Sequence, residues 1–398
     1  MNDQNKEQLE QKYQEYYSKL NPEQKEAVDT LDGPVITIAG AGTGKTQMLS
    51  VRIAKILQET QTNPYNILCL TFTDAGVTAM RKRLVEIIGP ASYQIKICTF
   101  HGFCNEIIST YPDKFNFKRD SEQIDDLEKV KFLNEVIDEL GNSSVLRPPN
   151  DHYYNQSAIE RNIQELKQEN FTPEKYEQVI LEIEEFLGLY WPLLEKFIDI
   201  KGSPTEAVLN NFHAQFNSIK SPETPIAKIW LNYYQEAYSQ YLSKLDGTKR
   251  NDGTKRTNFK RDLNNFFGEC KNNLPKQKEF GKAYRAYQKK LADNSRYDYS
   301  DMILFVTQKF QQDPYFLRIF QEKYEYILVD EYQDTNTSQN ITVTLLGQFF
   351  DKPNLFVVGD DDQSIYRFQG ASIENIISFY KYYEKDIKGN AIKITLSQ

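Results

Sequence analysis

Short, uninterrupted apolar runs alternate with segments of helical pattern at both ends of the chain. There are six such runs: Val35–Ile38, Ile67–Phe72, Ile95–Phe100, Tyr326–Val329, Leu355–Val358 and Ile392–Leu396. Apolar runs of this length are typical of strands that are buried on both faces of a parallel sheet. The pattern therefore predicts an α/β fold, in which helices cover both faces of a parallel sheet.

The middle of the chain lacks such runs. Between about residues 112 and 290 it is rich in Glu, Lys, Leu, Phe and Tyr, with helical stretches such as Val179–Leu189 and Ile226–Leu245. We interpret this part as a mainly helical subdomain inserted into the α/β domain. The predicted organisation is a first part of the α/β domain at 1–111, the insertion at 112–290 and a second part at 291–398.

Charge is distributed unevenly along the chain. The 398 residues include 48 Lys and Arg against 56 Asp and Glu, and the net charge of −8 argues mildly against a nucleic-acid partner. However, residues 120–200 carry 19 acids and 7 bases, whereas residues 244–290 carry 14 bases and 5 acids. The basic part contains a tandem Asp-Gly-Thr-Lys-Arg repeat, which predicts an exposed, turn-rich loop. Its cations either are simply solvated or contact nucleic acid: Lys249, Arg250, Lys255 and Arg256.

Composition argues against several other classes of protein. No apolar run approaches the roughly 18 residues of a membrane span, and the N-terminus lacks the basic start and apolar stretch of a signal peptide. The four cysteines show no CxxC spacing, so a zinc site and a disulfide framework both have little support. We therefore expect a protein of the reducing cytoplasm that has no membrane partner.

A glycine-rich segment follows the first predicted strand and precedes a helical stretch. This strand–loop–helix context is what a phosphate-binding loop requires, because glycines let backbone N–H groups approach phosphate oxygens. Lys45 would place a charge at the β- and γ-phosphates, and the Thr46 hydroxyl would bind Mg²⁺. The predicted nucleotide-binding residues are Ala39, Gly40, Ala41, Gly42, Thr43, Gly44, Lys45 and Thr46.

Two acids follow the predicted strand Tyr326–Val329 directly. A carboxylate at a strand end beside a phosphate loop can hold the Mg²⁺ shell, and the next one can orient and deprotonate water. We therefore assign Asp330 to the metal and Glu331 to general-base catalysis. The alternative is that both acids merely end a strand. A Ser or Cys nucleophile has no comparable support, and the three histidines are scattered along the chain.

Further motifs make the prediction more specific. In chain order they are Leu20–Gln24, Leu70–Thr73, Thr99–Phe103, Asp298–Asp301, Asp330–Asn336 and Gly359–Arg367. Together with the phosphate loop, they resemble the UvrD/Rep/PcrA group of superfamily-one DNA helicases. The resemblance covers about residues 20–110 and 295–398, and it implies a RecA-like fold that uses ATP and Mg²⁺.

The resemblance also implies roles for individual residues. Gln24 would pair with the adenine edge, and Gln47 stands where relatives commonly carry an Arg that stacks on adenine. Gln363 would sense the γ-phosphate and, with Lys45 and Glu331, take part in catalysis. The implied DNA-contacting residues are Phe72, Thr73, Thr99, His101, Tyr366 and Phe368. Aromatic platforms of this kind bind single-stranded nucleic acid largely without sequence preference.

The function implied is that of the N-terminal motor half of an ATP-dependent 3′–5′ DNA helicase or translocase in DNA repair, replication or recombination. Its partners would be single-stranded DNA and junctions of single- and double-stranded DNA. The chain ends at Gln398, before the family's Asn-Tyr-Arg and second RecA-like domain. We therefore expect a monomeric fragment that hydrolyses ATP poorly. Two alternatives stay open: the motor part of a helicase–nuclease, and an ATPase switch that acts on a protein partner.

Overall fold

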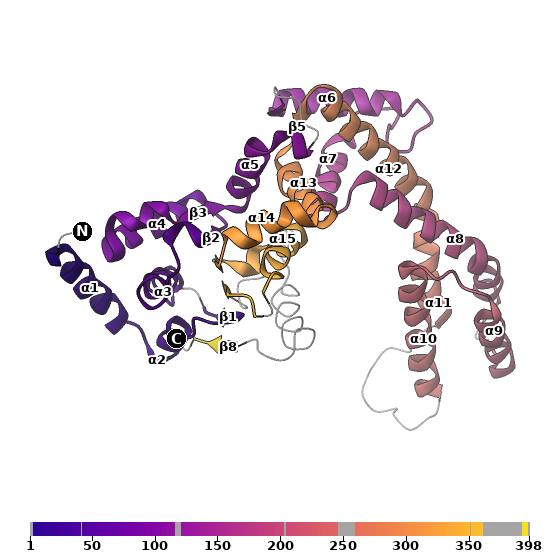
Figure 1. Ribbon diagram of the computed structural model, residues 1–398. Coiled ribbons are helices and arrows are strands. Elements are labelled where there is room, and N and C mark those ends of the chain that lie inside the picture. The colour runs from indigo at the N-terminus through magenta and orange to yellow at the C-terminus, as the bar shows by residue number, and fades with distance from the viewer. Residues whose placement is uncertain are drawn as a thin grey trace. The chain divides into compact units, whose positions relative to one another are not determined.

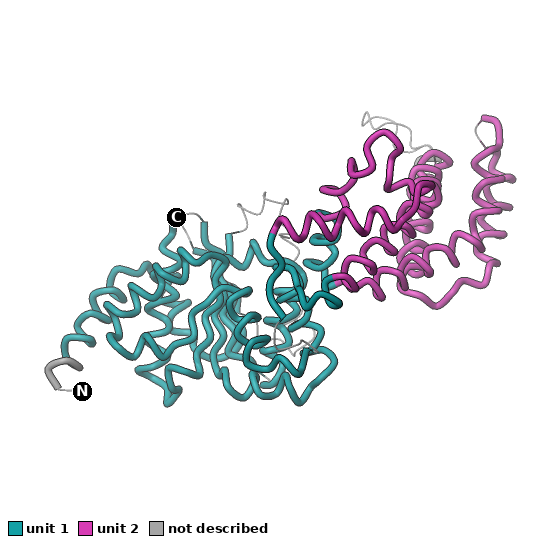
Figure 2. The backbone as a smooth tube through the Cα atoms, turned by 90° about the horizontal axis from the view of Figure 1, so that it is seen from above, with its two compact units in different colours: residues 1–125, 161–170, 291–398 teal, residues 126–160, 171–290 magenta. Residues whose placement is uncertain are grey.

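The computed structural model describes residues 3–40, 42–115, 121–202, 204–245, 259–350, 352–360 and 392–396. The chain forms two compact units, shown in different colours in Figure 2. Unit 1 comprises Met1–Asp125, Arg161–Asn170 and Leu291–Gln398, and unit 2 comprises Asp126–Glu160 and Phe171–Lys290. The insertion predicted at 112–290 ends at the same residue as unit 2, Lys290. Unit 2 begins later, however, and residues 161–170 belong to unit 1.

The six apolar runs form one six-stranded parallel sheet in unit 1. Its strands are β1 (Val35–Ile38), β2 (Ile67–Thr71), β3 (Lys96–Thr99), β6 (Tyr326–Val329), β7 (Leu355–Gly359) and β8 (Ile392–Thr395). They lie in the order β3-β2-β6-β7-β1-β8, and every pairing is parallel. The predicted α/β fold with a parallel sheet is therefore confirmed. Strand residues alternate between the two faces of such a sheet, and each face is covered by its own helices.

Two apolar layers enclose this sheet. Leu68 and Leu70 of β2 belong to the apolar layer on one face of the sheet. The helices that cover this face contribute Phe100, Phe103 and Val343 to the same layer. Those helices are α5 (Phe100–Thr110), α13 (Tyr299–Gln312), α14 (Pro314–Lys323) and α15 (Thr337–Gly347). Ile67 and Cys69 of the same strand belong to the other layer. Its helices are α1 (Asp3–Ser18), α2 (Pro22–Asp29), α3 (Lys45–Glu59) and α4 (Asp74–Ile88) (Figure 1).

Unit 2 is helical, as the sequence predicts, and its core is strongly aromatic. Rings of Phe186, Tyr190, Phe212, Trp230 and Phe267 are buried together, which is where much of the aromatic content of the chain is used. Its helices are α6 (Asp126–Glu139), α8 (Pro173–Ile198), α9 (Glu206–Ser218), α10 (Pro225–Leu245) and α11 (Phe259–Leu263), then most of α12 (Glu269–Asp293). A π-helical turn, Asn264–Gly268, joins the last two.

Unit 1 also contains a second, very short sheet that the sequence did not indicate. Strands β4 (Glu122–Gln123) and β5 (Arg296–Tyr297) pair in parallel. The stretch from about 112 to 290, predicted to be mainly helical, therefore contains one strand, β4, that the sequence did not indicate. Two residues are too few to produce an apolar run. Helix α7 (Gln156–Gln168) begins in unit 2 and ends in unit 1. None of the helices that the structure describes is long and apolar enough to cross a membrane.

A buried ion cluster fastens the end of α7 to the start of α13. The Lys167 ammonium group lies 2.5 Å from Asp298 Oδ2 and 2.7 Å from Asp301 Oδ1, and the Lys167 side chain is 0% exposed. The two aspartates also form the capping box of α13, since each side chain accepts from the backbone N–H of the other. One cation thus compensates two buried carboxylates that are needed for the helix start.

Replacing Lys167 by Met is expected to lower the free energy of unfolding by about 3–5 kcal/mol, because two buried carboxylates would lose their cation. The control is Lys19→Met, which breaks a pair with Glu15 whose side chains are 56% and 48% exposed. That variant should lose less than about 1 kcal/mol. Urea-induced unfolding followed by circular dichroism measures both. Equal losses would contradict a stabilising role for the buried cluster.

Candidate functional site

The predicted phosphate loop connects β1 to α3. Gly42 and Gly44 have φ angles of 76° and 77°, a left-handed conformation that glycine adopts without strain. The Thr43 hydroxyl donates to the Gly40 carbonyl at 2.8 Å, and α3 begins at Lys45. The loop therefore ends at a helix N-terminus, where backbone N–H groups and the helix dipole favour an anion.

Lys45 lies between the loop and the end of β7. Its ammonium group donates to the Ala39 carbonyl at 3.2 Å and is 3.7 Å from Asp360 Oδ2. The Asp360 side chain is 1% exposed, and its backbone N–H donates to Gln333 Oε1 at 3.0 Å. A phosphate that bound in the loop would therefore compete with Asp360 for the lysine charge.

The two predicted catalytic acids stand at the end of β6, beside the loop. Burial raises the pKa of Asp330, whereas the Glu331 N–H, the Lys45 charge and a hydrogen bond with the Thr46 side chain lower it. Thr46 and Asp330, the predicted metal ligands, are thus neighbours. Among the described residues, no group of three or more His, Cys, Asp or Glu side chains could hold a metal ion. Mg²⁺ needs fewer protein ligands than that when phosphates and water complete its shell.

Glu331 has an unusual backbone and an acidic environment. Its φ and ψ are 52° and 43°, a left-handed conformation that costs a non-glycine residue about 1–2 kcal/mol. Its N–H donates to Asp330 Oδ1 at 3.0 Å. Burial raises the pKa of Glu331, and the charges of Asp330 and Asp334 raise it further. A half-buried carboxylate with a raised pKa is suited to accept a proton from water.

Gln24 is closely bound within the protein itself. Its Oε1 accepts from the Asn21 N–H at 2.9 Å, completing the capping box of α2, and its Nε2 donates to the Thr43 carbonyl at 2.5 Å. The predicted adenine-reading residue thus contacts the phosphate loop directly. Gln47, the other residue predicted to lie near adenine, is half-buried on the first turn of α3.

A second feature of unit 1 is an aromatic pocket of about 290 Å³. The rings of His101 and Tyr299 are stacked, with centroids 3.6 Å apart and planes inclined by 16°. Phe72, which follows β2, also lines the pocket, as do Phe100, Lys167, Gln168, Ser300, Ile303, Asn336, Ser338 and Gln339. The structure therefore brings the predicted residues Phe72 and His101 together. Tyr299 was not predicted as a site residue, although its position in the Asp298–Asp301 motif was a usable signal.

The two predicted DNA-contacting threonines have local structural roles. Thr73 is the N-cap of α4 and accepts from the Gly76 N–H, and Thr99 is the N-cap of α5 and accepts from the Gly102 N–H. Each therefore stabilises the helix start beside a pocket residue. The remaining predicted site residues lie outside the described residues and stay predictions: Ala41, Lys249, Arg250, Lys255, Arg256, Gln363, Tyr366 and Phe368.

Fold and site together define a class of protein. A parallel α/β domain carries a phosphate loop after β1 and an Asp-Glu pair after β6, which is the arrangement of a RecA-like P-loop nucleotide-binding domain. The model of the family described as the UvrD/REP helicase N-terminal domain matches residues 20–384. The chain belongs to this family.

Curated relatives agree with this assignment. The ATP-dependent DNA helicase PcrA of Bacillus subtilis (strain 168) is 30% identical over 381 residues, which are 96% of this chain and 37% of that protein. The proteins of the same name from Staphylococcus aureus (strain Mu50 / ATCC 700699) and Staphylococcus epidermidis are 29% identical over 364 residues, 92% of this chain and 36% of each. The chain thus spans a little over a third of the length of these relatives.

The stability of unit 1 should depend on the protonation of His101. Burial lowers the pKa of His101 from 6.5 to about 4, so the unfolded chain binds more protons between these values. The free energy of unfolding is therefore expected to fall as the pH falls from about 6.5 to about 4, by at most about 3 kcal/mol. His101→Phe keeps a ring against Tyr299 but does not titrate, and it should lose this part of the pH dependence. Identical pH profiles for the two proteins in chemical denaturation would contradict the prediction.

Proposed function

We propose that this chain is the N-terminal motor part of an ATP-dependent 3′–5′ DNA helicase or translocase that acts in DNA repair, replication or recombination. In this proposal unit 1 is the first RecA-like domain, which binds ATP with Mg²⁺ and single-stranded DNA, including its junctions with duplex. The name of the curated relatives, ATP-dependent DNA helicase, supports the reaction. Family membership over most of the chain supports its assignment to this part of the motor.

One observation carries the proposal: a single short segment reaches both candidate sites. Residues 330–336 begin with Asp330 beside Lys45 and Thr46, and they end with Asn336, which lines the aromatic pocket. Between these ends the Gln333 side chain accepts from the Asp360 N–H and donates to Asp334 at 3.0 Å. A change in charge at the phosphate loop therefore acts on the same buried segment that forms the wall of the pocket.

In the nucleotide site, the residues divide the work of phosphoryl transfer. The loop N–H groups and Lys45 would hold the phosphates, and Thr46 and Asp330 would hold Mg²⁺, which would neutralise charge on the phosphate oxygens. Glu331 orients the attacking water and accepts its proton. When Lys45 binds the phosphates, its charge is withdrawn from Asp360. The backbone N–H of Asp360 in turn donates a hydrogen bond to the Gln333 side chain.

In the aromatic pocket, DNA would be bound by stacking of its bases on rings, not by base-specific hydrogen bonds. Phe72 and the His101–Tyr299 stack offer apolar faces on which unpaired bases can stack, because every base has a π-face. His101 is uncharged at neutral pH, since burial lowers its pKa to about 4. The pocket thus favours stacking, and the basic repeat at 246–256 is proposed to contact phosphates.

Glu331→Gln should abolish ATP hydrolysis but leave nucleotide binding intact, because an amide cannot accept the proton from water. Turnover is measured with the chain in excess over radiolabelled ATP, and binding is measured with a fluorescent ATP analogue. The variant should also unfold at higher temperature than the unaltered chain, since removing one charge relieves repulsion with Asp330 and Asp334. Hydrolysis at the unaltered rate would exclude Glu331 as the base.

Phe72→Ala should weaken binding of an oligothymidine strand by about 1–3 kcal/mol, the usual contribution of one stacked base. The control is Tyr65→Ala, which removes a ring that is 53% exposed and does not line the pocket. Fluorescence anisotropy at several salt concentrations measures both, and log K should fall with log salt for every variant. If Phe72→Ala binds as tightly as Tyr65→Ala, the pocket is not the DNA site. Absence of any binding by the unaltered chain at about 50 mM salt would favour a protein partner instead.

A further inference from the structure

Helix α2 connects the phosphate loop to a polar network at the opposite end of the helix. It has only 8 residues, so tertiary contacts must hold it in place. At its N-terminal end, Gln24 donates to the Thr43 carbonyl at 2.5 Å, and its amide nitrogen lies against Gly44. A shift of α2 would therefore change the position of the phosphate loop through this hydrogen bond.

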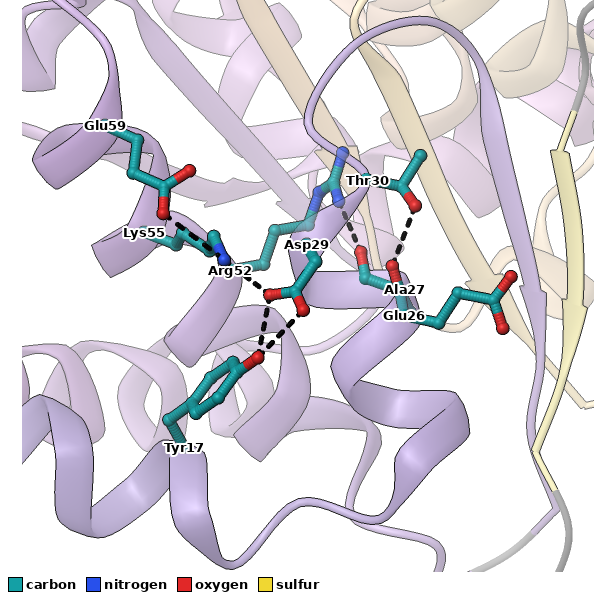
Figure 3. A network of polar contacts seen from close by, with 8 residues as sticks. All are labelled: Tyr17, Glu26, Ala27, Asp29, Thr30, Arg52, Lys55 and Glu59. Atoms are coloured by element: carbon teal, nitrogen blue, oxygen red, sulfur yellow. Dashed lines mark hydrogen bonds and ion pairs between the residues drawn. The ribbon is translucent and has the colours of Figure 1, made fainter.

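Two contacts from α3 hold the other end of α2. The Arg52 guanidinium donates to the Ala27 carbonyl, as Figure 3 shows. It also donates to the Leu31 carbonyl and lies 4.1 Å from the centre of the Phe356 ring. Arg52 is 1% exposed, and a cation at a helix C-terminus is favourable because it faces unpaired carbonyls. The second contact is an ion pair of 2.5 Å between Lys55 and Asp29, the last residue of α2.

Helix α1 supplies a third contact, and it converges on the same carboxylate. The Tyr17 hydroxyl donates to both oxygens of Asp29, at 3.0 and 2.8 Å (Figure 3). Asp29 thus lies between Tyr17 of α1 and Lys55 of α3. Tyr17 is a donor at neutral pH, as any tyrosine of ordinary pKa is, and burial and the bond to Asp29 raise its pKa further.

The neighbouring tyrosine provides a natural comparison. Tyr16 donates to Glu86 of α4 at 2.5 Å, also a tyrosine–carboxylate bond. It fastens α1 to the domain as Tyr17 does, but its acceptor is not on α2. Loss of either hydroxyl therefore removes a tyrosine–carboxylate contact from the same helix.

We propose that Tyr17 is a positioning residue for the nucleotide site: by binding Asp29 it fixes α2, whose Gln24 holds the phosphate loop at Thr43. This inference rests on the proposed binding of ATP at that loop. It predicts an effect on nucleotide affinity alone, since Lys45, Asp330 and Glu331 are carried by other elements. The dissociation constant and the KM for ATP change, and kcat does not.

The test compares Tyr17→Phe with Tyr16→Phe in the whole chain, by titration with a fluorescent ATP analogue in the presence of Mg²⁺. Phe keeps the Tyr17 ring, which Lys55 approaches at 5.5 Å, so only the hydroxyl is lost. Tyr17→Phe should weaken binding about 3–10-fold, and Tyr16→Phe should leave it unchanged. Asp29→Asn also removes the ion pair with Lys55, so it should weaken binding at least as much as Tyr17→Phe. Melting temperatures recorded in parallel show whether the two variants lose similar stability.

A double variant tests the route through Gln24. If the effect passes through this side chain, Tyr17→Phe weakens binding in the unaltered chain and has no further effect in a Gln24→Ala background. Equal affinities of Tyr17→Phe and Tyr16→Phe, or losses that add in the double variant, would overturn the inference. Failure of the unaltered chain to bind ATP, or equal binding by Lys45→Ala, would instead overturn the proposed function itself.

Discussion

The parallel direction of all six strands is the constraint on which the site depends. Because the strands run the same way, their carboxyl ends meet at one edge of the sheet, and whatever follows each strand is collected there. The phosphate loop follows β1, the Asp330–Glu331 pair follows β6, and Asp360 follows β7. Phe72 and His101 follow the neighbouring strands β2 and β3. Because β2 and β6 are paired, the Asp330 N–H donates to the Leu70 carbonyl at 2.9 Å, so the two candidate sites are joined by the sheet itself.

Buried charge at this edge is arranged so that the protein does not fully compensate it. The pKa values of three acids are raised, and burial is the first cause in each: Asp330, Glu331 and Asp334. The charge of Lys45 opposes this shift in all three, but it does not cancel it. Such a cluster favours binding of a divalent cation, because the cation would relieve repulsion among the carboxylates and would itself attract phosphates. Buried charge elsewhere in unit 1 has direct partners within the protein: Lys167 pairs with two aspartates, and Arg52 donates to carbonyls at the end of α2. Burial still raises the pKa of Asp301 to about 6 and lowers that of Arg52 to about 9.

Much of this architecture could be predicted from the sequence, because strands buried on both faces produce apolar runs. All six runs became strands. Strands β4 and β5 were missed because two-residue strands leave no periodic signal. The pocket residue Tyr299 was missed because its stacking on His101 depends on packing between α5 and α13. Thr73 and Thr99 were predicted only as DNA-contacting residues, and their helix-capping roles were missed because the same residue type suits both. The bond from Gln24 to Thr43 depends on tertiary structure and has no sequence signature.

The most direct test of the account is a crystal structure of the chain with a non-hydrolysable ATP analogue and Mn²⁺ in place of Mg²⁺, with the metal located by its anomalous scattering. We expect a metal peak within coordination distance of the Thr46 hydroxyl, with Asp330 in its shell. The γ-phosphate should lie against Lys45, which should have moved away from Asp360. A metal bound elsewhere, or a nucleotide whose phosphates do not contact the loop that connects β1 to α3, would contradict the central claim that this sheet edge is the nucleotide site.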